Sequence, residues 1–222
     1  MYPFVKRFFD ILASLVALLL LSPFLLIIIV LLKFSGEGEI FYPQKRIGYR
    51  NRYFFIYKFA TMLKNSLNMS SGSITLRNDP RVTPVGKYLR ITKLNELPQV
   101  INVLKGDMSI VGPRPLVDKT FNAYSTVIRD KVYNTKPGIT GIGSVVFRDE
   151  EEQISSSGMP PHEFYEKYIA PYKGDLEIWY QQHQSFSVDL TIIFLTVWVI
   201  LFPKSRLTYK IFSDLPKRTL TL

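Results

Sequence analysis

The stretch that decides the fold is residues 11–32, which read ILASLVALLLLSPFLLIIIVLL without a charged side chain. About 22 apolar residues are enough for a helix to cross the hydrocarbon core of a bilayer. Ser22 and Pro23 lie in the middle of this run, and a proline inside a helix removes one backbone hydrogen bond and bends the helix. The Ser22 hydroxyl could satisfy a freed carbonyl, because hydrocarbon offers it no other partner. The sequence therefore predicts a bent membrane helix.

Basic residues flank the apolar run on both sides. Lys6 and Arg7 precede it, and five more follow it, namely Lys33, Lys45, Arg46, Arg50 and Arg52. A spanning helix normally carries its lysine and arginine excess on the cytoplasmic side only. A cleaved signal peptide is disfavoured because Asp10 borders the run, the run is long, and no small-residue cleavage site follows. A spanning helix stays open, but the charges favour a helix that enters the bilayer and returns to the same side.

The composition limits the chemistry that the chain can perform. With 222 residues and 47% hydrophobic content, the chain can form one compact domain and is not intrinsically disordered. The net charge of +10 points to an anionic partner, such as nucleic acid, an anionic membrane or a phosphorylated small molecule. Cysteine is absent and histidine occurs twice, which excludes a thiol nucleophile and a cysteine zinc site. Catalysis would depend on carboxylates, Lys, Arg, Tyr, Ser or a bound metal ion.

Beyond the apolar run, the pattern predicts a mixture of short elements. Residues 38–44 and 53–59 read as strands around a turn at 48–52. A polar loop is expected at 63–81, and helices are expected at 87–105, ending before Gly106, at 117–134 and at 167–184. The last apolar stretch, residues 190–202, is too short to span a bilayer. It favours a helix in contact with the membrane interface over a wholly buried core element.

Several motifs in this order resemble one family. They are KRFFDILASLVALLLLSPFLL at 6–26, GEIFYPQKRIGYRNRYFFIYKFATM at 38–62, DPRVTPVGKYLRITKLNELPQVINVLKGDMSIVGPRPL at 79–116, KPGITG at 136–141 and SFSVDLTIIFLTVWVIL at 185–201. Together they cover nearly the whole chain. The chain resembles the bacterial sugar transferases, which are monotopic polyprenyl-phosphate phosphoglycosyltransferases.

This resemblance implies an enzyme at the cytoplasmic face of the bacterial inner membrane. Such enzymes transfer a sugar 1-phosphate from a UDP-sugar to undecaprenyl phosphate, release UMP, and begin the membrane steps of polysaccharide or glycoconjugate synthesis. The expected fold is an irregular α/β fold with a small sheet and interfacial amphipathic helices. Residues 1–34 would form a re-entrant membrane helix broken at Ser22 and Pro23, and residues 35–222 a cytoplasmic catalytic domain with an interfacial C-terminal helix.

The family places a catalytic Asp-Glu pair at the start of its Leu-Pro-Gln helix, and this chain has Asn95-Glu96 there. The family aspartate attacks the sugar-bearing phosphate, and the glutamate helps to hold Mg²⁺. An amide is not a competent nucleophile, so a covalent step through Asn95 is doubtful. Read without the family, Asn95 would be a helix cap and Glu96 a first-turn acid.

The other candidate site residues are mostly cations. Arg90 and Arg114 match family positions that contact phosphate, and Lys58 and Arg148 could also neutralise a diphosphate. Asp79 or Asp149 could join Glu96 around Mg²⁺. Glu177 matches an acidic position of the family and could orient an arginine. The ordinary alternatives are a surface ion pair for Arg114, a surface helix acid for Glu177 and a solvated charge run for residues 148–152.

Two mechanisms remain open for the first hypothesis, a phosphoglycosyltransferase. The polyprenyl phosphate could attack directly, or Glu96 could replace the missing aspartate as nucleophile. The alternative is a catalytically impaired paralogue that binds nucleotide sugar or lipid carrier, or partners an active transferase. A nucleic-acid binder is disfavoured, because residues 49–58 read more simply as basic strands near anionic headgroups. The expected partners are a UDP-sugar, polyprenyl phosphate and anionic lipids; a homo-oligomer stays open.

Overall fold

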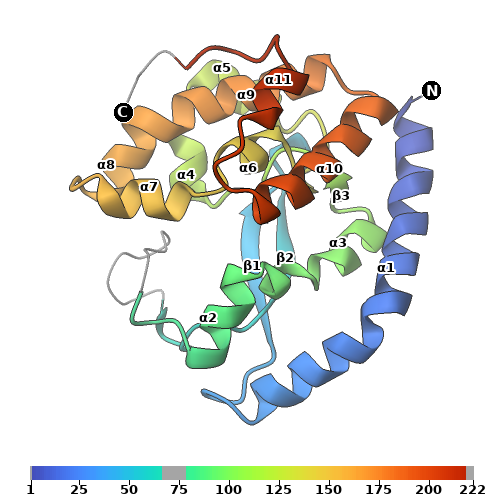
Figure 1. Cartoon of the computed structure of the whole chain (residues 1–222), viewed down its shortest axis with the longest axis vertical. Helices are drawn as coiled ribbons and strands as arrows, with labels where there is room; N and C mark the ends of the chain where they lie inside the picture. Colours follow the sequence, from blue (N-terminus) through green and yellow to red (C-terminus); the bar gives the residue numbers. More distant parts are fainter. Residues whose placement is uncertain (1, 67–78, 219–222) are drawn as a thin grey trace.

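The computed structural model describes residues 2–66 and 79–218 (Figure 1). The predicted polar loop at 63–81 lies largely outside them. The α-helices are α1 (Tyr2–Lys33), α2 (Pro84–Ile91), α3 (Gln99–Lys105), α4 (Asp118–Asn122), α5 (Thr126–Val132), α6 (Ile142–Val146), α7 (Glu150–Ser156), α8 (Pro161–Phe164), α9 (Ala170–Gln182), α10 (Phe186–Leu201) and α11 (Leu207–Ile211). The strands are β1 (Phe41–Ile47), β2 (Tyr53–Phe59), β3 (Ser109–Val111) and β4 (Gly138–Thr140). Short turns of other helix types are η1 (Tyr49–Asn51), η3 (Leu94–Glu96) and η4 (Tyr165–Ile169). The fold is therefore mixed, rich in helices, with small sheets.

Helix α1 is one continuous element that changes direction near its middle. Figure 1 shows it descending along one side of the molecule and then turning to run beneath it. The Ser22 hydroxyl donates to the carbonyl of Leu19 over 2.9 Å. That carbonyl lies four residues before Pro23, so it is the one whose helical partner the proline removes. The Ser22 hydroxyl thus bonds to the carbonyl that Pro23 leaves without a helical partner.

Helix α1 is long and apolar enough to cross a membrane. Of its most apolar stretch of 18 residues, 11% is buried inside the protein. Both of its ends nevertheless contact the rest of the chain. Near the start, Arg7 donates to the carbonyls of Val103 and Leu104 over 2.5 and 2.8 Å. Near the end, Ile28 and Leu32 are buried in one cluster with Phe59 and Leu89. The helix is thus held to one body at both ends.

The hairpin predicted around residues 48–52 is confirmed. Strands β1 and β2 pair antiparallel, with Tyr42 opposite Lys58, Gln44 opposite Ile56 and Arg46 opposite Phe54. Directly opposed residues lie on the same face of a sheet. Arg46 and Lys58 therefore share one face of the hairpin.

The single helix expected at 87–105 is divided into α2, η3 and α3. Lys93 adopts a left-handed conformation before η3 (φ 60°), and Pro98 precedes α3. The predicted end at Gly106 is confirmed, with φ 90° at that residue, a conformation that favours glycine. The stretch 117–134 likewise forms two helices, α4 and α5, separated by residues 123–125. The helix expected at 167–184 is present as η4 followed by α9.

The main core lies where α9 and α10 pack against α6 and the short parallel pair β3–β4. Leu176, Tyr180, Ile192, Leu195 and Ile142 are all fully buried there. The opposite face of α10 is apolar and exposed, with Phe194, Val197, Ile200 and Leu201. Helix α10 therefore contributes both to the core and to an apolar surface.

Candidate active site

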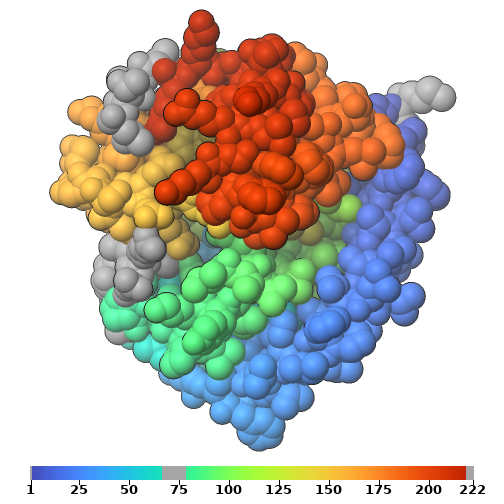
Figure 2. All heavy atoms as spheres, in the orientation of Figure 1, coloured from blue at the N-terminus to red at the C-terminus, as the bar shows by residue number. Residues whose placement is uncertain are grey.

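A cavity of about 470 Å³ lies between the β1–β2 hairpin, η3 and α7. Figure 2 shows a separate groove between the green surface of α2 and α3 and the red surface of α10, and neither α3 nor α10 lines the cavity. Five of the predicted site residues line the cavity: Lys58, Arg90, Asn95, Glu96 and Arg114. They come from β2, α2, η3 and the loop after β3, so residues from four separate segments meet in one place.

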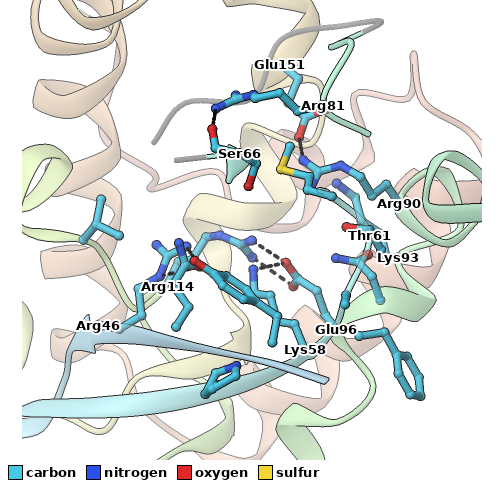
Figure 3. A pocket seen from close by; sticks show the side chains of 18 of the residues that line it. Arg46, Lys58, Thr61, Ser66, Arg81, Arg90, Lys93, Glu96, Arg114 and Glu151 are labelled. Atoms are coloured by element: carbon cyan, nitrogen blue, oxygen red, sulfur yellow. Dashed lines mark hydrogen bonds and ion pairs between the residues drawn. The ribbon is translucent and has the colours of Figure 1, made fainter. Parts of the chain in front are cut away.

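Glu96 lies at the centre of this group (Figure 3). Its Oε1 accepts from Lys58 Nζ over 3.0 Å and from Arg114 Nη2 over 2.6 Å, and its Oε2 accepts from Arg114 Nη1 over 3.2 Å. The Glu96 and Lys58 side chains are 13% and 14% exposed. Burial by itself would raise the pKa of Glu96, but the charges of Arg114 and Lys58 outweigh it and hold that pKa well below its ordinary value. Glu96 is thus a fixed anion with both oxygens engaged.

The cations around Glu96 affect one another. Burial and, less strongly, the charges of Arg114 and Arg46 lower the pKa of Lys58 to about 7, although Glu96 opposes the change. The charge of Glu96 raises the pKa of Arg114 above its ordinary value against the effect of burial. Burial, followed by the charge of Arg114, lowers the pKa of Arg46 to about 10. Three cations therefore face one carboxylate, and the site has an excess of positive charge.

Arg46 is a site residue that the sequence interpretation did not single out. It lines the cavity, and it donates to the neutral Gln44 side chain and to the carbonyl of Pro115 over 3.1 Å. The first strand was predicted at 38–44, which leaves out position 46, whereas the observed β1 places positions 46 and 58 on one face.

The loop that carries Arg114 is held in place by backbone contacts. The Tyr133 hydroxyl donates to the carbonyl of Arg114 over 2.8 Å and accepts from the amide of Leu116 over 2.9 Å. Gly112 lies so close to the Lys136–Gly138 backbone that a Cβ at this position would be 2.3 Å from a carbonyl oxygen. The tight packing of β3 on β4 therefore orients Arg114 towards Glu96.

Ion pairs occupy the opposite wall of the cavity. Arg90 of α2 contacts Glu151 of α7 at 3.0 Å, and the buried Lys173 contacts Glu150. Arg81, which also lines the cavity, forms a buried ion pair with Asp79 at 2.6 Å. Asp79 is therefore engaged by an arginine.

Besides Asp79, three further residues predicted for this site do not line the cavity. Arg148 and Asp149 pair with each other at the start of α7. Glu177 is 1% exposed on α9 and lies against Gly143, and burial raises its pKa to about 8. The charge of Lys173 and, less strongly, the backbone amide of Arg114 oppose this increase in the Glu177 pKa. Glu177 therefore lies under the Arg114 loop and outside the cavity.

The described residues contain no cluster of three or more His, Asp or Glu side chains that could hold a metal ion. Two residues with oxygen-bearing side chains, Asn95 and Glu96, do line the cavity. Asn95 is 6% exposed, and its Oδ1 has no hydrogen-bond partner in residues 2–66 and 79–218. Magnesium commonly binds through one or two protein oxygens, several waters and the phosphates of a substrate. Asn95 Oδ1 and Glu96 fit such an ion only together with a substrate.

Comparison with known proteins identifies the family of the chain. A model of the family described as "Bacterial sugar transferase" matches residues 1–203. The chain is 34% identical to the exopolysaccharide production protein ExoY of Sinorhizobium fredii, over 86% of this chain and 83% of that protein.

Two longer relatives have names that state an activity. The chain is 36% identical to the UDP-N-acetylgalactosamine-undecaprenyl-phosphate N-acetylgalactosaminephosphotransferase of Aeromonas hydrophila, over 90% of this chain and 44% of that protein. It is also 36% identical to the UDP-glucose:undecaprenyl-phosphate glucose-1-phosphate transferase of Klebsiella pneumoniae, over 87% of this chain and 39% of that protein. Because the family match spans almost the whole chain, this protein belongs to the bacterial sugar transferase family.

Proposed function

We propose that this protein transfers a sugar 1-phosphate from a UDP-sugar to undecaprenyl phosphate and releases UMP, as the first membrane step in making a polysaccharide or glycoconjugate. The observation that carries the proposal is Glu96, held by Arg114 and Lys58 in the wall of a cavity that also contains Arg46. The family assignment and the reactions named for two of its relatives support the same activity.

The charge of the site suits a diphosphate. Arg46, Lys58 and Arg114 face Glu96, so two positive charges remain uncompensated when all four groups are ionised. The pKa values of Lys58 and Arg46 are both lowered in the free protein. A bound diphosphate would restore these pKa values, and the recovered interaction would favour binding. Each arginine guanidinium would donate two parallel hydrogen bonds to oxygens of one phosphate group.

A magnesium ion at this site would be held by Glu96 and by the amide oxygen of Asn95, with the remaining ligands from the substrate and water. It would neutralise charge on the phosphates during transfer. To bind it, Glu96 would have to release one of its contacts with Lys58 or Arg114. Lys58 suits that exchange, because it contacts one oxygen of Glu96 whereas Arg114 contacts both, and its charged amine can turn to the phosphates.

The contacts of Glu96 favour direct displacement. Both of its oxygens accept hydrogen bonds from cations, which makes the carboxylate a poor nucleophile. Position 95 carries an amide, which does not attack phosphorus. An oxygen of the polyprenyl phosphate would form the new bond to the sugar-bearing phosphorus. The bond from that phosphorus to the bridging oxygen would break, and UMP would leave with that oxygen. Arg46, Lys58 and Arg114 would hold the phosphates in line.

We further propose that α1 is re-entrant and that the domain lies at the cytoplasmic face of the inner membrane. The helix has 32 residues, or about 48 Å of length at 1.5 Å per residue. Its first half contacts α3 through Arg7, and its last turns pack on Phe59 and Leu89. A straight spanning helix could not keep both contacts with one domain on one side of a bilayer about 30 Å thick.

The chain has no cysteine, so single cysteines report this topology. Phe4 and Phe34 are 84% and 87% exposed near the two ends of α1. Phe4→Cys and Phe34→Cys should both react with a membrane-impermeant thiol reagent in inverted inner-membrane vesicles, and neither in intact spheroplasts. Reaction of the two positions from opposite sides would overturn the re-entrant proposal.

The activity is tested with the full chain in lipid nanodiscs, undecaprenyl phosphate, Mg²⁺ and radiolabelled UDP-sugars. We expect label in the lipid fraction, UMP in equal amount, and no label on protein after a quench. Glu96→Gln should reduce turnover at least a hundredfold, because it removes the anion that orders two cations. Glu163→Gln, an exposed glutamate on α8, is the matched control and should retain full turnover.

Position 95 carries an amide in place of the family's aspartate. This difference favours a second function, that of a binding protein without transfer activity. Binding of UDP-sugars by calorimetry, with no UMP formed under any condition, would support that alternative. Unchanged turnover in Glu96→Gln would refute the proposed site. Label that stays on protein in the wild type would refute direct displacement.

A further inference from the structure

Asn102 of α3 is fully buried and joins two elements of the site. Its Oδ1 accepts from the backbone amide of Tyr57 over 3.0 Å, and its Nδ2 donates to the backbone carbonyl of Phe55 over 2.7 Å. In a strand, the carbonyl of one residue and the amide two residues later face the same edge. Strand β1 pairs with the other edge of β2, so the Asn102 amide completes β2 as a neighbouring strand would.

The two elements joined by Asn102 are the ones that carry Lys58 and Glu96. Lys58 follows Tyr57 directly in β2, and Glu96 lies in η3, which leads into α3 through Pro98. The Lys58–Glu96 contact is 3.0 Å long. Asn102 therefore forms a second bridge between these elements, made by a short side chain with little freedom to adjust.

Helix α3 is also held by α1, on the side away from β2, so α3 can fix the position of the Asn102 side chain. Arg7 of α1 binds the carbonyls of Val103 and Leu104, the two residues after Asn102. The carbonyl of Asn102 itself accepts from the amides of Gly106 and Asp107 over 3.1 and 3.0 Å. With α3 held in this way, the Asn102 amide sets where β2 lies.

We infer that Asn102 is a positioning residue, whose two hydrogen bonds to β2 set the distance between Lys58 and Glu96. The inference rests on the proposed function for its kinetic consequence but not for its geometry. Removing the amide would leave two backbone groups of β2 unpaired and let the strand move. A shift of about 1 Å at reacting groups can cost up to about a hundredfold in rate.

The test is a double-mutant cycle in the full chain in nanodiscs, with kcat and KM measured for the UDP-sugar. Asn102→Leu removes both hydrogen bonds to β2, together with a longer contact of 3.5 Å from Nδ2 to Asp107, at similar volume. We expect it to lower kcat about tenfold or more. In the Lys58→Met background, the same change should cost less than about twofold, because the contact that it disturbs is already absent. An equal loss in both backgrounds would overturn the inference.

Gln181 provides a matched control. Its Nε2 donates to the backbone carbonyls of Lys131 and Val132 over 2.7 and 2.8 Å, away from the cavity. Gln181→Leu should lower the thermal midpoint without lowering kcat. If Asn102→Leu does not fold, Asn102→Asp serves in its place, because it keeps the acceptor for Tyr57 and loses the donor for Phe55. A cycle for Gln181 that matches the one for Asn102 would also overturn the inference.

A readout that needs no substrate separates this inference from the proposed function. The coupling between Lys58→Met and Glu96→Gln in the free energy of unfolding reports the Lys58–Glu96 contact without substrate. That coupling should fall at least twofold in the Asn102→Leu background and stay unchanged in the Gln181→Leu background. A coupling in Asn102→Leu equal to the wild-type value would refute the positioning role even if the protein transfers no sugar.

Discussion

The hydroxyl of Ser22 donates a hydrogen bond to the carbonyl of Leu19 over 2.9 Å, and Pro23 is the residue that denies this carbonyl its helical partner. The two adjacent residues therefore act as a unit: the proline bends α1, and the serine satisfies the backbone group that the bend exposes. An unpaired carbonyl in hydrocarbon would cost several kcal/mol by transfer scales. The bend is what allows both ends of α1 to reach the same domain.

The Ser22–Pro23 unit predicts a non-additive effect on stability. Ser22→Ala should lower the free energy of unfolding in bicelles by about 1 kcal/mol or more, because the Leu19 carbonyl loses its partner. In the Pro23→Ala background the same change should cost much less, since the new amide at position 23 can bond to Leu19. Ser35→Ala, which removes a longer contact of 3.4 Å, is the control. Equal costs of Ser22→Ala in both backgrounds would contradict this account.

Arg46 should contribute to substrate binding more than to stability. Arg46→Gln removes a cation from a cavity with an excess of positive charge. Arg46 donates to the neutral Gln44 side chain and the Pro115 carbonyl, so the free protein should not lose an ion pair. We expect KM for the UDP-sugar to rise about tenfold, which corresponds to about 1.4 kcal/mol, and to depend less on salt. Arg52→Gln changes an exposed arginine outside the cavity and should leave KM unchanged. Equal effects of the two variants on KM would point to a general loss of charge.

The parts of the fold that could be predicted depend on local patterns. The long apolar helix, its bend near Pro23, the β1–β2 hairpin and the helix end at Gly106 each follow from neighbouring residues. The division of residues 84–105 into α2, η3 and α3 was missed, because apolar spacing continues through Pro98 and the left-handed Lys93. Periodicity alone does not detect such breaks.

The site was predictable only where a motif marked it. Lys58, Glu96 and Arg114 were identified, and the structure brings them into contact. Asn102 escaped notice because its role depends on pairing with Phe55 and Tyr57, which are more than 40 positions away. Glu177 was noticed as an acidic position, but its burial under the Arg114 loop depends on packing between distant segments. Contacts of this kind require the assembled fold.

Lys58 should make kcat/KM depend on pH near neutrality, as one limb of the pH profile. Its pKa of about 7 means that the free enzyme carries a charged Lys58 below this pH and a neutral one above it. The value of kcat/KM for the UDP-sugar should therefore fall as pH rises through about 7, because the neutral amine no longer attracts the diphosphate. Lys58→Arg keeps its charge and should remove this limb, whereas Lys87→Arg on the exposed face of α2 should retain it. A limb that persists in Lys58→Arg would assign the titration to another group.

Glu177 should make the stability of the folded protein depend on pH. Burial raises its pKa from 4.5 to about 8, so the folded state binds more protons than the unfolded state between these values. The contribution of Glu177 to stability is thus full below pH 4.5 and is lost as pH rises towards 8, at about 1.4 kcal/mol per pH unit within this window at most. Glu177→Gln stays neutral at every pH. We expect its free energy of unfolding in bicelles to fall less than that of the wild type between pH 5 and 8, and to exceed the wild-type value at pH 8. The exposed Glu163→Gln should follow the wild type, and a Glu177→Gln curve parallel to the wild-type curve would mean that Glu177 stays ionised in the folded protein.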